Sequence, residues 1–247
     1  MRIIARLDVK PPHVVKPIHF DGLKKLGKPQ DFAKKYYEDG ADEIVYIDIV
    51  SSLYQRSILF DLAKDVSKEI FTPFAVGGGV KTIEHVQELI HNGADKVILN
   101  TNAIENPAII KEITSIFGSQ AVTIHIQAKK WDNWYECYTD CGRNRSGKEV
   151  IEWAKEVEKL GAGEIILSVI DNDGRKRGFD LELSEKLINA VNIPVVIGSG
   201  AGSLEDVLEV AKLNPSGIAI ASLLHYDIYS IKEIKQYLIH NGLNIHI

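Results

Sequence analysis

An internal repeat with a period of 121 residues constrains the fold of this chain more than any other feature of its sequence. The segment GADEIV at Gly40 recurs as GAGEII at Gly161, and PFAVGGG at Pro73 recurs as PVVIGSG at Pro194. Similar segments at one fixed offset indicate the duplication of a structural unit. We therefore expect the chain to fold into two similar halves.

The two halves span approximately residues 1–120 and 121–247. Asp8, at the end of an apolar run in the first half, corresponds to Gln127 in the second half. Their offset is two residues shorter than the period, as expected where loops differ in length. The repeat thus aligns a carboxylate, which can transfer protons, with an amide, which cannot do so near neutral pH.

Short apolar runs alternate with longer amphipathic segments along the whole chain. Residues 3–9 and 43–50 are typical of strands buried on both faces. Residues 31–40, 57–70 and 83–93 carry apolar side chains at helical spacing. Eight such strand–helix pairs in about 250 residues predict one α/β domain, a (β/α)₈ TIM barrel built from two half-barrels. Two flavodoxin-like domains are the alternative, but no Pro/Gly/Ser-rich linker separates the halves.

Composition excludes several classes of function. The formal net charge of −5 comes from interspersed charges of both signs, which argues against a nucleic-acid partner. No apolar run approaches the ~20 residues that span a bilayer, and the first residues do not resemble a secretory signal. Cys137 and Cys141 are too few for a structural zinc site, so we expect reduced thiols and no metal. The expected location is the cytoplasm.

In a (β/α)₈ barrel, the active site lies where the strands end and the following loops begin. Polar residues and glycines occupy these positions in both halves of the chain. They are Asp8, Asp48, Gly77, Gly78, Gly79, Asn100 and Thr101 in the first half, and Gln127, Ser168, Asp171, Asp173, Gly198, Ser199, Gly200 and Ser222 in the second.

Two glycine-rich turns precede expected helices and predict phosphate sites. VGGGVKTIEHV has Thr82 as the expected N-cap, and the repeated IGSGAGSLEDV has Ser203. Backbone N–H groups in such turns, together with a helix N-terminus, attract anions. A third glycine loop at residues 171–178 adds three basic side chains. The pattern predicts a ligand with a phosphate at each end. The alternative is that the second turn is only a remnant of the duplication. The glycines do not fit a dinucleotide fingerprint, and we expect no cofactor.

The segments RIIARLDVK, GADEIVYIDI, GADKVILNTNAIENP and DNDGRKRGFD occur in the order and spacing of the HisF family. The whole chain resembles these proteins, the cyclase subunits of imidazole glycerol phosphate synthase. The resemblance implies a duplicated half-barrel that binds a bisphosphate ribotide. It also implies a heterodimer with a HisH-like glutaminase, whose ammonia is used to form an imidazole ring and release an aminoimidazole carboxamide ribotide.

The resemblance also assigns roles to individual residues. Asp8 corresponds to a catalytic aspartate, and Lys16 to a loop lysine that reaches the substrate. Gln127 occupies the position of a second catalytic aspartate. The phosphate-binding positions are Gly78, Gly79, Asn100 and Thr101 at one end, and Asp173, Gly174, Ser199, Gly200 and Ser222 at the other.

At the opposite end of the barrel, the resemblance implies a charged entrance for ammonia. Arg2, Glu43, Lys96 and Glu164 correspond to this ring, and Asp95 corresponds to a contact with the glutaminase. The two cations and two anions could pair with one another, which avoids the cost of an unpaired buried charge. An ordinary salt-bridge plug at the barrel base is the alternative.

The sequence departs from the family at the expected site of chemistry. Gln127 cannot act as a general acid or base, and a positioned proton transfer contributes about 10²–10⁴-fold to a rate. Arg6 and His125 replace small residues. Two functions remain: an imidazole glycerol phosphate synthase subunit, weakened or rescued by another acid, or a diverged paralogue. The paralogue would deliver ammonia to a third enzyme, an amidotransferase that makes amidine sugars for surface polysaccharides or flagella.

Overall fold

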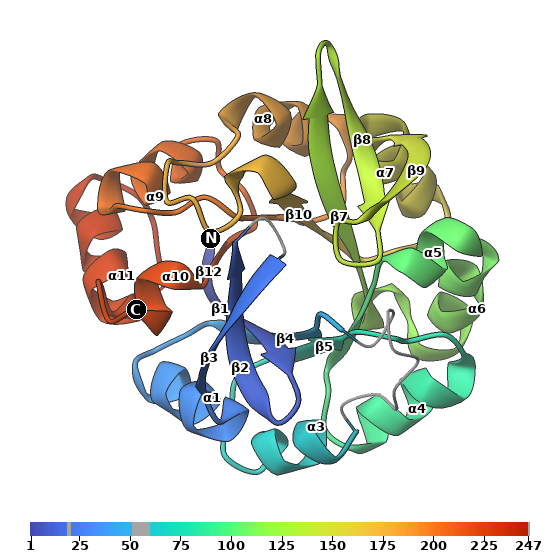
Figure 1. Cartoon of the computed structure of the whole chain (residues 1–247), viewed down its shortest axis with the longest axis horizontal. Helices are drawn as coiled ribbons and strands as arrows, with labels where there is room; N and C mark the ends of the chain where they lie inside the picture. Colours follow the sequence, from blue (N-terminus) through green and yellow to red (C-terminus); the bar gives the residue numbers. More distant parts are fainter. Residues whose placement is uncertain (19–20, 51–59, 247) are drawn as a thin grey trace.

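A computed structural model describes residues 1–18, 21–50 and 60–246, with side chains from 17 to 23 left undescribed. Within these residues, eight parallel strands close into a barrel that is surrounded by helices (Figure 1). The predicted α/β TIM barrel is confirmed. The barrel strands are β1 (Arg2–Lys10), β4 (Glu43–Asp48), β5 (Phe74–Gly77), β6 (Lys96–Leu99), β7 (Val122–Trp131), β10 (Glu164–Val169), β11 (Val195–Gly198) and β12 (Gly217–Ile220).

The order of the strands places the two halves of the chain on opposite sides of the barrel. Around the ring the order is β1, β4, β5, β6, β7, β10, β11 and β12, and β12 pairs again with β1. β1 and β7 are therefore four strands apart in either direction. A side chain that reaches from β1 to β7 must cross the barrel interior.

The strand registers follow the period of the sequence repeat. Ile44 pairs with Phe74 between β4 and β5, and Ile165 pairs with Val195 between β10 and β11. Each member of the second pair lies 121 residues after its counterpart in the first pair. The proposed half-barrel boundaries rest on this correspondence and on the sequence repeat.

Helices cover the outside of the barrel, and their termini follow the expected signals. Thr82 caps α4 by accepting a hydrogen bond from the His85 backbone N–H, and Ser203 caps α9 in a capping box with Asp206. Both predicted caps are confirmed. Of the helix expected over residues 57–70, residues 57–59 lie outside the described residues. The helices are α1 (Pro29–Glu38), α3 (Phe60–Ser67), α4 (Ile83–His91), α5 (Thr101–Glu105), α6 (Ala108–Phe117), α7 (Val150–Lys159), α8 (Leu181–Ala190), α9 (Leu204–Ala211), α10 (Ser222–His225) and α11 (Ile231–His240), with short 3₁₀ turns η1 (Ser119–Ala121) and η2 (Ile170–Asn172).

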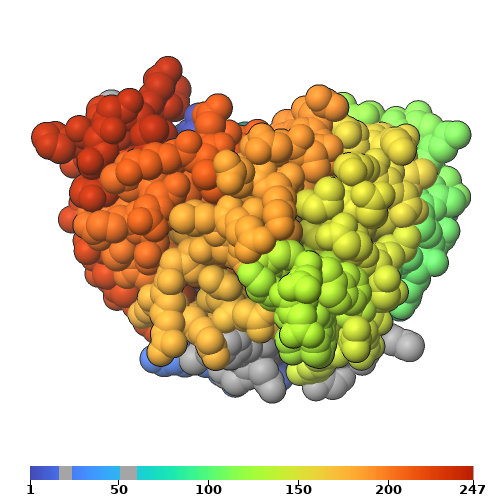
Figure 2. Space-filling view, turned by 90° about the horizontal axis from the view of Figure 1, so that it is seen from above, coloured from blue at the N-terminus to red at the C-terminus, as the bar shows by residue number. Residues whose placement is uncertain are grey.

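Each half also carries an antiparallel extension that the sequence did not predict. β1 continues into β2 (His13–Ile18) and β3 (Asp21–Gly27), where a long loop was expected over residues 10–20. Residues 19 and 20 lie outside the described residues. β7 continues into β8 (Trp134–Thr139) and β9 (Asn144–Glu149), which project beyond the barrel (Figure 1). Beside α8 and α9, this second extension forms part of one continuous face (Figure 2).

Alternation along the strands separates two apolar regions. In β1, Ile3, Ala5 and Leu7 pack outward against the helices, whereas Ile4 packs with interior side chains such as Val45 and Ile166. The even-numbered positions of β1 therefore face the interior, which places Arg2, Arg6 and Asp8 inside the barrel. In the described part of the chain, no helix has the length and apolarity needed to cross a membrane.

Candidate active site

The first glycine turn borders a cavity of about 250 Å³ at the carboxyl ends of the strands of the first half. Gly78 and Gly79 have φ angles of +113° and +68°. A Cβ atom at Gly78 would lie 2.5 Å from the carbonyl oxygen of Asp48, so only glycine fits there. Asn100 and Thr101 line the same cavity. The structure thus brings together all four residues that were predicted to bind the first phosphate.

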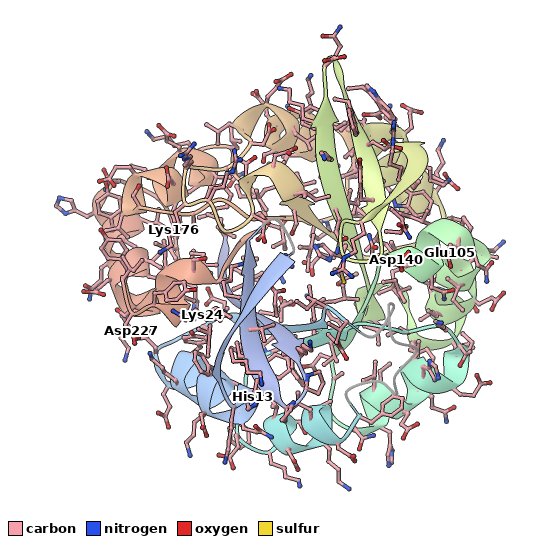
Figure 3. The ribbon with its side chains drawn as sticks, viewed as in Figure 1. His13, Lys24, Glu105, Asp140, Lys176 and Asp227 are labelled. Carbon is pink, nitrogen blue, oxygen red and sulfur yellow. The ribbon has the colours of Figure 1, made fainter. Side chains whose placement is uncertain are left out.

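Side-chain hydrogen bonds hold this first phosphate cradle in place. Asn100 Nδ2 donates to the carbonyl oxygens of His125, at 2.8 Å, and Tyr138, at 3.1 Å. The backbone N–H of Asp140 donates to Thr101 Oγ1 at 3.0 Å. The unpredicted β8 strand and the turn after it therefore position the cradle. Asp140 and Glu105, which line the cavity, lie on the opposite side of the barrel from Lys176 (Figure 3).

The second phosphate cradle is assembled but narrow. Its cavity is about 20 Å³, and its wall includes all five predicted second-phosphate residues: Asp173, Gly174, Ser199, Gly200 and Ser222. Ser199 has a φ of +70°, and its buried hydroxyl has no hydrogen-bond partner. A Cβ atom at Gly200 would lie 2.2 Å from the Gly178 carbonyl oxygen. A phosphate therefore needs more room than this conformation offers, and the Ser199 hydroxyl is a donor available to it.

Lys16 links the second cradle to the predicted catalytic aspartate. Its side chain is 6 % exposed. Lys16 Nζ lies 3.1 Å from Asp173 Oδ1 and 3.6 Å from Asp8 Oδ2. The β1–β2 pairing, in which Asp8 lies opposite Val15, brings this lysine over the strand end. Lys16 thus covers Asp8 and contributes a cation to the wall of the cradle.

Arg6 provides the closer partner of Asp8. Arg6 Nε and Nη2 each lie 3.0 Å from Asp8 Oδ1. Burial by itself would raise the pKa of Asp8, but the charges of Arg6 and then Lys16 outweigh it and hold that pKa below its usual value. Asp8 is therefore ionised at neutral pH and can accept a proton only from an acidic donor.

The Arg6 side chain crosses the barrel interior. Its Nη1 donates to Ser168 Oγ on β10 at 2.6 Å and lies 3.5 Å from His125 Nε2 on β7. His125 and Ser168 also form a hydrogen bond to each other, at 2.9 Å. Burial, reinforced by the charge of Arg6, holds the pKa of His125 well below its usual value, so the imidazole is neutral. Together these three side chains form a polar bridge between the two half-barrels.

Gln127 stands apart from this bridge. It is 4 % exposed and lines the first cavity, whereas Asp8 is fully buried beneath Arg6 and Lys16. Its Oε1 atom is buried and has no hydrogen-bond partner. In this conformation Gln127 therefore lines a cavity whose wall does not include Asp8, and Arg6 extends from β1 toward His125 on β7.

At the opposite end of the barrel, the four predicted charges form a closed ring. Arg2 forms ion pairs with Glu43 and Glu164. Lys96 Nζ lies 3.1 Å from Glu43 and 2.9 Å from Glu164. Each cation thus bridges both anions at the amino ends of β1, β4, β6 and β10. We call Arg2, Glu43, Lys96 and Glu164 the basal ring.

The basal ring is partly buried, and this burial affects its charges. Burial raises the pKa of Glu43, and the charge of Lys96 only partly opposes this shift. Burial lowers the pKa of Arg2, but attraction to Glu164 and Glu43 outweighs burial and raises it overall. Because every charge has two opposite partners, the ring is stable when closed, and passage through it requires at least one pair to separate.

A surface groove lies at the same end of the barrel as the basal ring. Asp95 is exposed, and its Oδ2 accepts a hydrogen bond from the Phe74 backbone N–H at 2.8 Å. Phe71 lies with Asp95 along one surface groove and is 84 % exposed.

A metal or zinc role is not supported among the described residues. No group of three or more His, Cys, Asp or Glu side chains there is arranged to hold a metal ion. Cys137 and Cys141 are both buried and are not joined in a disulfide. Burial raises the pKa of the Cys137 thiol well above its usual value, so this thiol is unreactive.

Comparisons with known proteins agree with this geometry. The family described as histidine biosynthesis protein matches residues 2–230. A HisF subunit of imidazole glycerol phosphate synthase from Pyrococcus furiosus is 46 % identical over 246 residues, covering 100 % of this chain and 98 % of the relative. The chain belongs to the HisF family. HisF subunits from Thermococcus onnurineus and Petrotoga mobilis are 45 % and 42 % identical over the same shares of both chains.

The sequence singled out Arg6 and His125 as departures from the HisF family but did not predict a contact between their side chains. Ser168 was named only as a strand-end residue. The available signal was the two-residue periodicity of strands. Arg6 lies two residues before Asp8, and His125 lies two residues before Gln127, so each pair shares one face of its strand. That signal places all four side chains inside the barrel, but it cannot give the length of the contact across it.

Proposed function

We propose that this chain is the cyclase subunit of an imidazole glycerol phosphate synthase. In this proposal it is a lyase that binds a ribotide phosphorylated at both ends and uses ammonia from a glutaminase subunit. The single observation that carries the proposal is the pair of phosphate cradles on opposite sides of one barrel mouth. Relatives that carry this name match the chain over its full length.

The cradles are proposed to hold the two phosphates so that the middle of the ribotide spans the mouth. Gly78 and Gly79 line the first cavity, where their backbone N–H groups are proposed to bind one phosphate. Lys16 and the Ser199 hydroxyl are proposed to bind the other phosphate at the second cavity. Because Asp8 is ionised and lies next to Lys16, it is proposed to act as the proton acceptor during ring closure. Gln127 can orient the ligand but cannot exchange protons with it.

Ammonia is proposed to enter at the basal ring from a glutaminase docked on the same face. Phe71 and Asp95 lie on that face and would contact the partner. The interior path then meets the bridge of Arg6, His125 and Ser168. Passage therefore requires two movements, opening of the basal ring and displacement of Arg6. The two buried cysteines, which form no disulfide, fit a reducing cytoplasmic setting.

The alternative function is not supported. The relatives named above are HisF subunits of imidazole glycerol phosphate synthase. Nothing in the described residues points to a third amidotransferase or to an amidine sugar.

The direct test supplies the purified chain with ammonium salts and the bisphosphate ribotide. We expect imidazole glycerol phosphate to form, and Asp8→Asn to abolish its formation. Gln127→Asp restores a second proton-transfer group and is expected to raise the rate by up to about 10²–10⁴-fold. Exposed Lys34→Ala is the control and leaves the rate unchanged. Failure of both the native chain and Gln127→Asp to form product would contradict the proposed function.

A further inference from the structure

The amide of Gln127 is a buried polar group that the protein leaves unsatisfied. Gln127 is 4 % exposed, and its Oε1 atom has no hydrogen-bond partner. The neighbouring polar side chains inside the barrel bond to one another instead, since Ser168 Oγ accepts from Arg6 and lies 2.9 Å from His125 Nε2. Buried polar groups almost always have partners, because an unmade hydrogen bond is costly. An orphaned acceptor in a cavity wall therefore indicates a site for a donor from outside the chain.

The cavity around Gln127 has the chemistry of a two-part ligand site. At one side, Gly78 and Gly79 offer backbone N–H groups to an anion. Elsewhere the wall carries the carboxylates of Asp48, Glu105 and Asp140 as well as Gln127 Oε1, all of which accept hydrogen bonds. The volume of about 250 Å³ accommodates a phosphate together with a small group attached to it. An attached group that donates hydrogen bonds would satisfy these acceptors.

We propose that Gln127 is a specificity-determining residue that accepts a hydrogen bond from a neutral N–H or O–H donor on a ligand whose phosphate occupies the first cradle. The ligand class is a phosphorylated compound that carries hydroxyl, amine or carboxamide donors close to the phosphate. This inference rests on the proposed function and specifies how one end of the ribotide is recognised. It assigns to Gln127 a binding role in place of the proton-transfer role that an aspartate would have.

The choice of an amide has a physical consequence for ligand charge. Asp48, Glu105 and Asp140 already place three carboxylates in the wall of the cavity. A fourth carboxylate at position 127 would favour a cationic donor, because opposite charges attract strongly where water is excluded. A neutral amide accepts a hydrogen bond without that bias. Gln127 therefore selects an uncharged donor.

The test compares Gln127→Met with the native chain by titration calorimetry, without ammonia so that no turnover occurs. Methionine has a similar length but cannot replace the amide oxygen as an acceptor. The probes are the bisphosphate ribotide, ribose 5-phosphate and inorganic phosphate. We expect Kd for the first two probes to rise by about 5- to 150-fold, because an unmatched hydrogen bond of ordinary strength is lost. Kd for inorganic phosphate stays within twofold, since phosphate does not need Gln127.

A second readout separates recognition from a structural role. Removing an unsatisfied buried amide leaves the free protein as stable or more stable, so the Tm of Gln127→Met without ligand does not fall. Gln87→Met, at an exposed position on α4, is the matched control and changes neither Kd nor Tm. A lower Tm together with an equal loss of phosphate binding would show a structural role and overturn the proposal, as would unchanged Kd values for both sugar phosphates.

The outcomes also distinguish this inference from the proposed function. If the native chain fails to bind the bisphosphate ribotide, the proposed function fails. The role of Gln127 is then decided by ribose 5-phosphate, whose hydroxyl groups are neutral donors on a phosphorylated compound. A loss of its binding in Gln127→Met supports the inference, and equal binding by the two proteins overturns it. Gln127→Asp adds the charge test: tighter binding of the two sugar-phosphate probes, whose donor groups are uncharged, by this variant would contradict the selection for an uncharged donor.

Discussion

Replacing Arg6 by methionine tests the polar bridge that distinguishes this barrel. Arg6 is 4 % exposed, holds Asp8 through contacts of 3.0 Å, and donates to Ser168 at 2.6 Å. The variant keeps the bulk of the side chain but leaves Asp8 with Lys16 alone, at 3.6 Å. Breaking a buried pair by removal of one partner costs about 3–5 kcal/mol of unfolding free energy. Because Lys16 remains, we expect the lower end of that range at pH 7.

The loss of unfolding free energy in Arg6→Met should depend on pH. In the native chain the pKa of Asp8 lies below its usual value, so the ion pair contributes stability above the unfolded pKa of about 3.9 and loses it as pH falls through the folded pKa. In the variant, burial dominates and raises the pKa of Asp8, so ionised Asp8 destabilises the fold at neutral pH. The difference in stability between the two proteins is therefore largest near pH 7. It shrinks as pH falls, first through the raised pKa of Asp8 in the variant and then through its lowered pKa in the native chain.

Urea unfolding followed by tryptophan fluorescence measures both the loss of unfolding free energy and its dependence on pH. The double variant Arg6→Met with Asp8→Asn removes the stranded charge and should recover most of the loss. Lys34→Met breaks an exposed pair with Glu69 and serves as the control, with an expected change below about 1 kcal/mol. A loss for Arg6→Met no larger than that of the control, or no recovery in the double variant, would refute the reasoning.

Three further predictions follow from the ring, the second cradle and a helix cap. Lys96→Ala removes two contacts of the basal ring, so glutamine-fed turnover by the complex should fall more than ammonium-fed turnover; equal effects would contradict the channel. Gly200→Ala should lose about 1–3 kcal/mol more unfolding free energy in urea than Gly147→Ala. Both glycines have positive φ, but only at Gly200 would the new Cβ atom contact a carbonyl oxygen. Equal losses in the two variants would argue against this close approach. Ser203→Ala should lower the unfolding free energy by about 1 kcal/mol, because the capping box of α9 is removed; no change in the urea midpoint would count against the cap.

The barrel was predictable because its pattern is local and repeated. Apolar runs such as residues 43–50 and helical spacing such as residues 83–93 each identify one element. The glycine turns were predictable for the same reason. Gly78 and the N-caps Thr82 and Ser203 each act on the backbone next to them in the sequence. The constant offset between repeats then limits how the elements can be arranged.

The polar bridge and the strand extensions were not predictable from local pattern. Arg6 contacts Ser168 across the barrel, 162 residues away in sequence. Sequence periodicity gives the face of a strand but not how far a flexible side chain reaches or which partner it selects. Lys16 pairs with Asp173 because β2 folds back on β1, and the sequence there suggested a loop. These contacts decide the charge of the site, which is why the environment of Asp8 and Gln127 needed the structure.

The central claim is that ammonia made by a glutaminase passes through the barrel to a phosphate-anchored ribotide. Isotope competition tests it most directly: the complex receives glutamine labelled with ¹⁵N in its amide group, together with unlabelled ammonium in the solution, and the imidazole product is analysed by mass spectrometry. The account predicts product that carries mainly the ¹⁵N label, and dilution of the label when Lys96 is replaced by alanine. Product labelled only in proportion to the mixed ammonia in solution would contradict it.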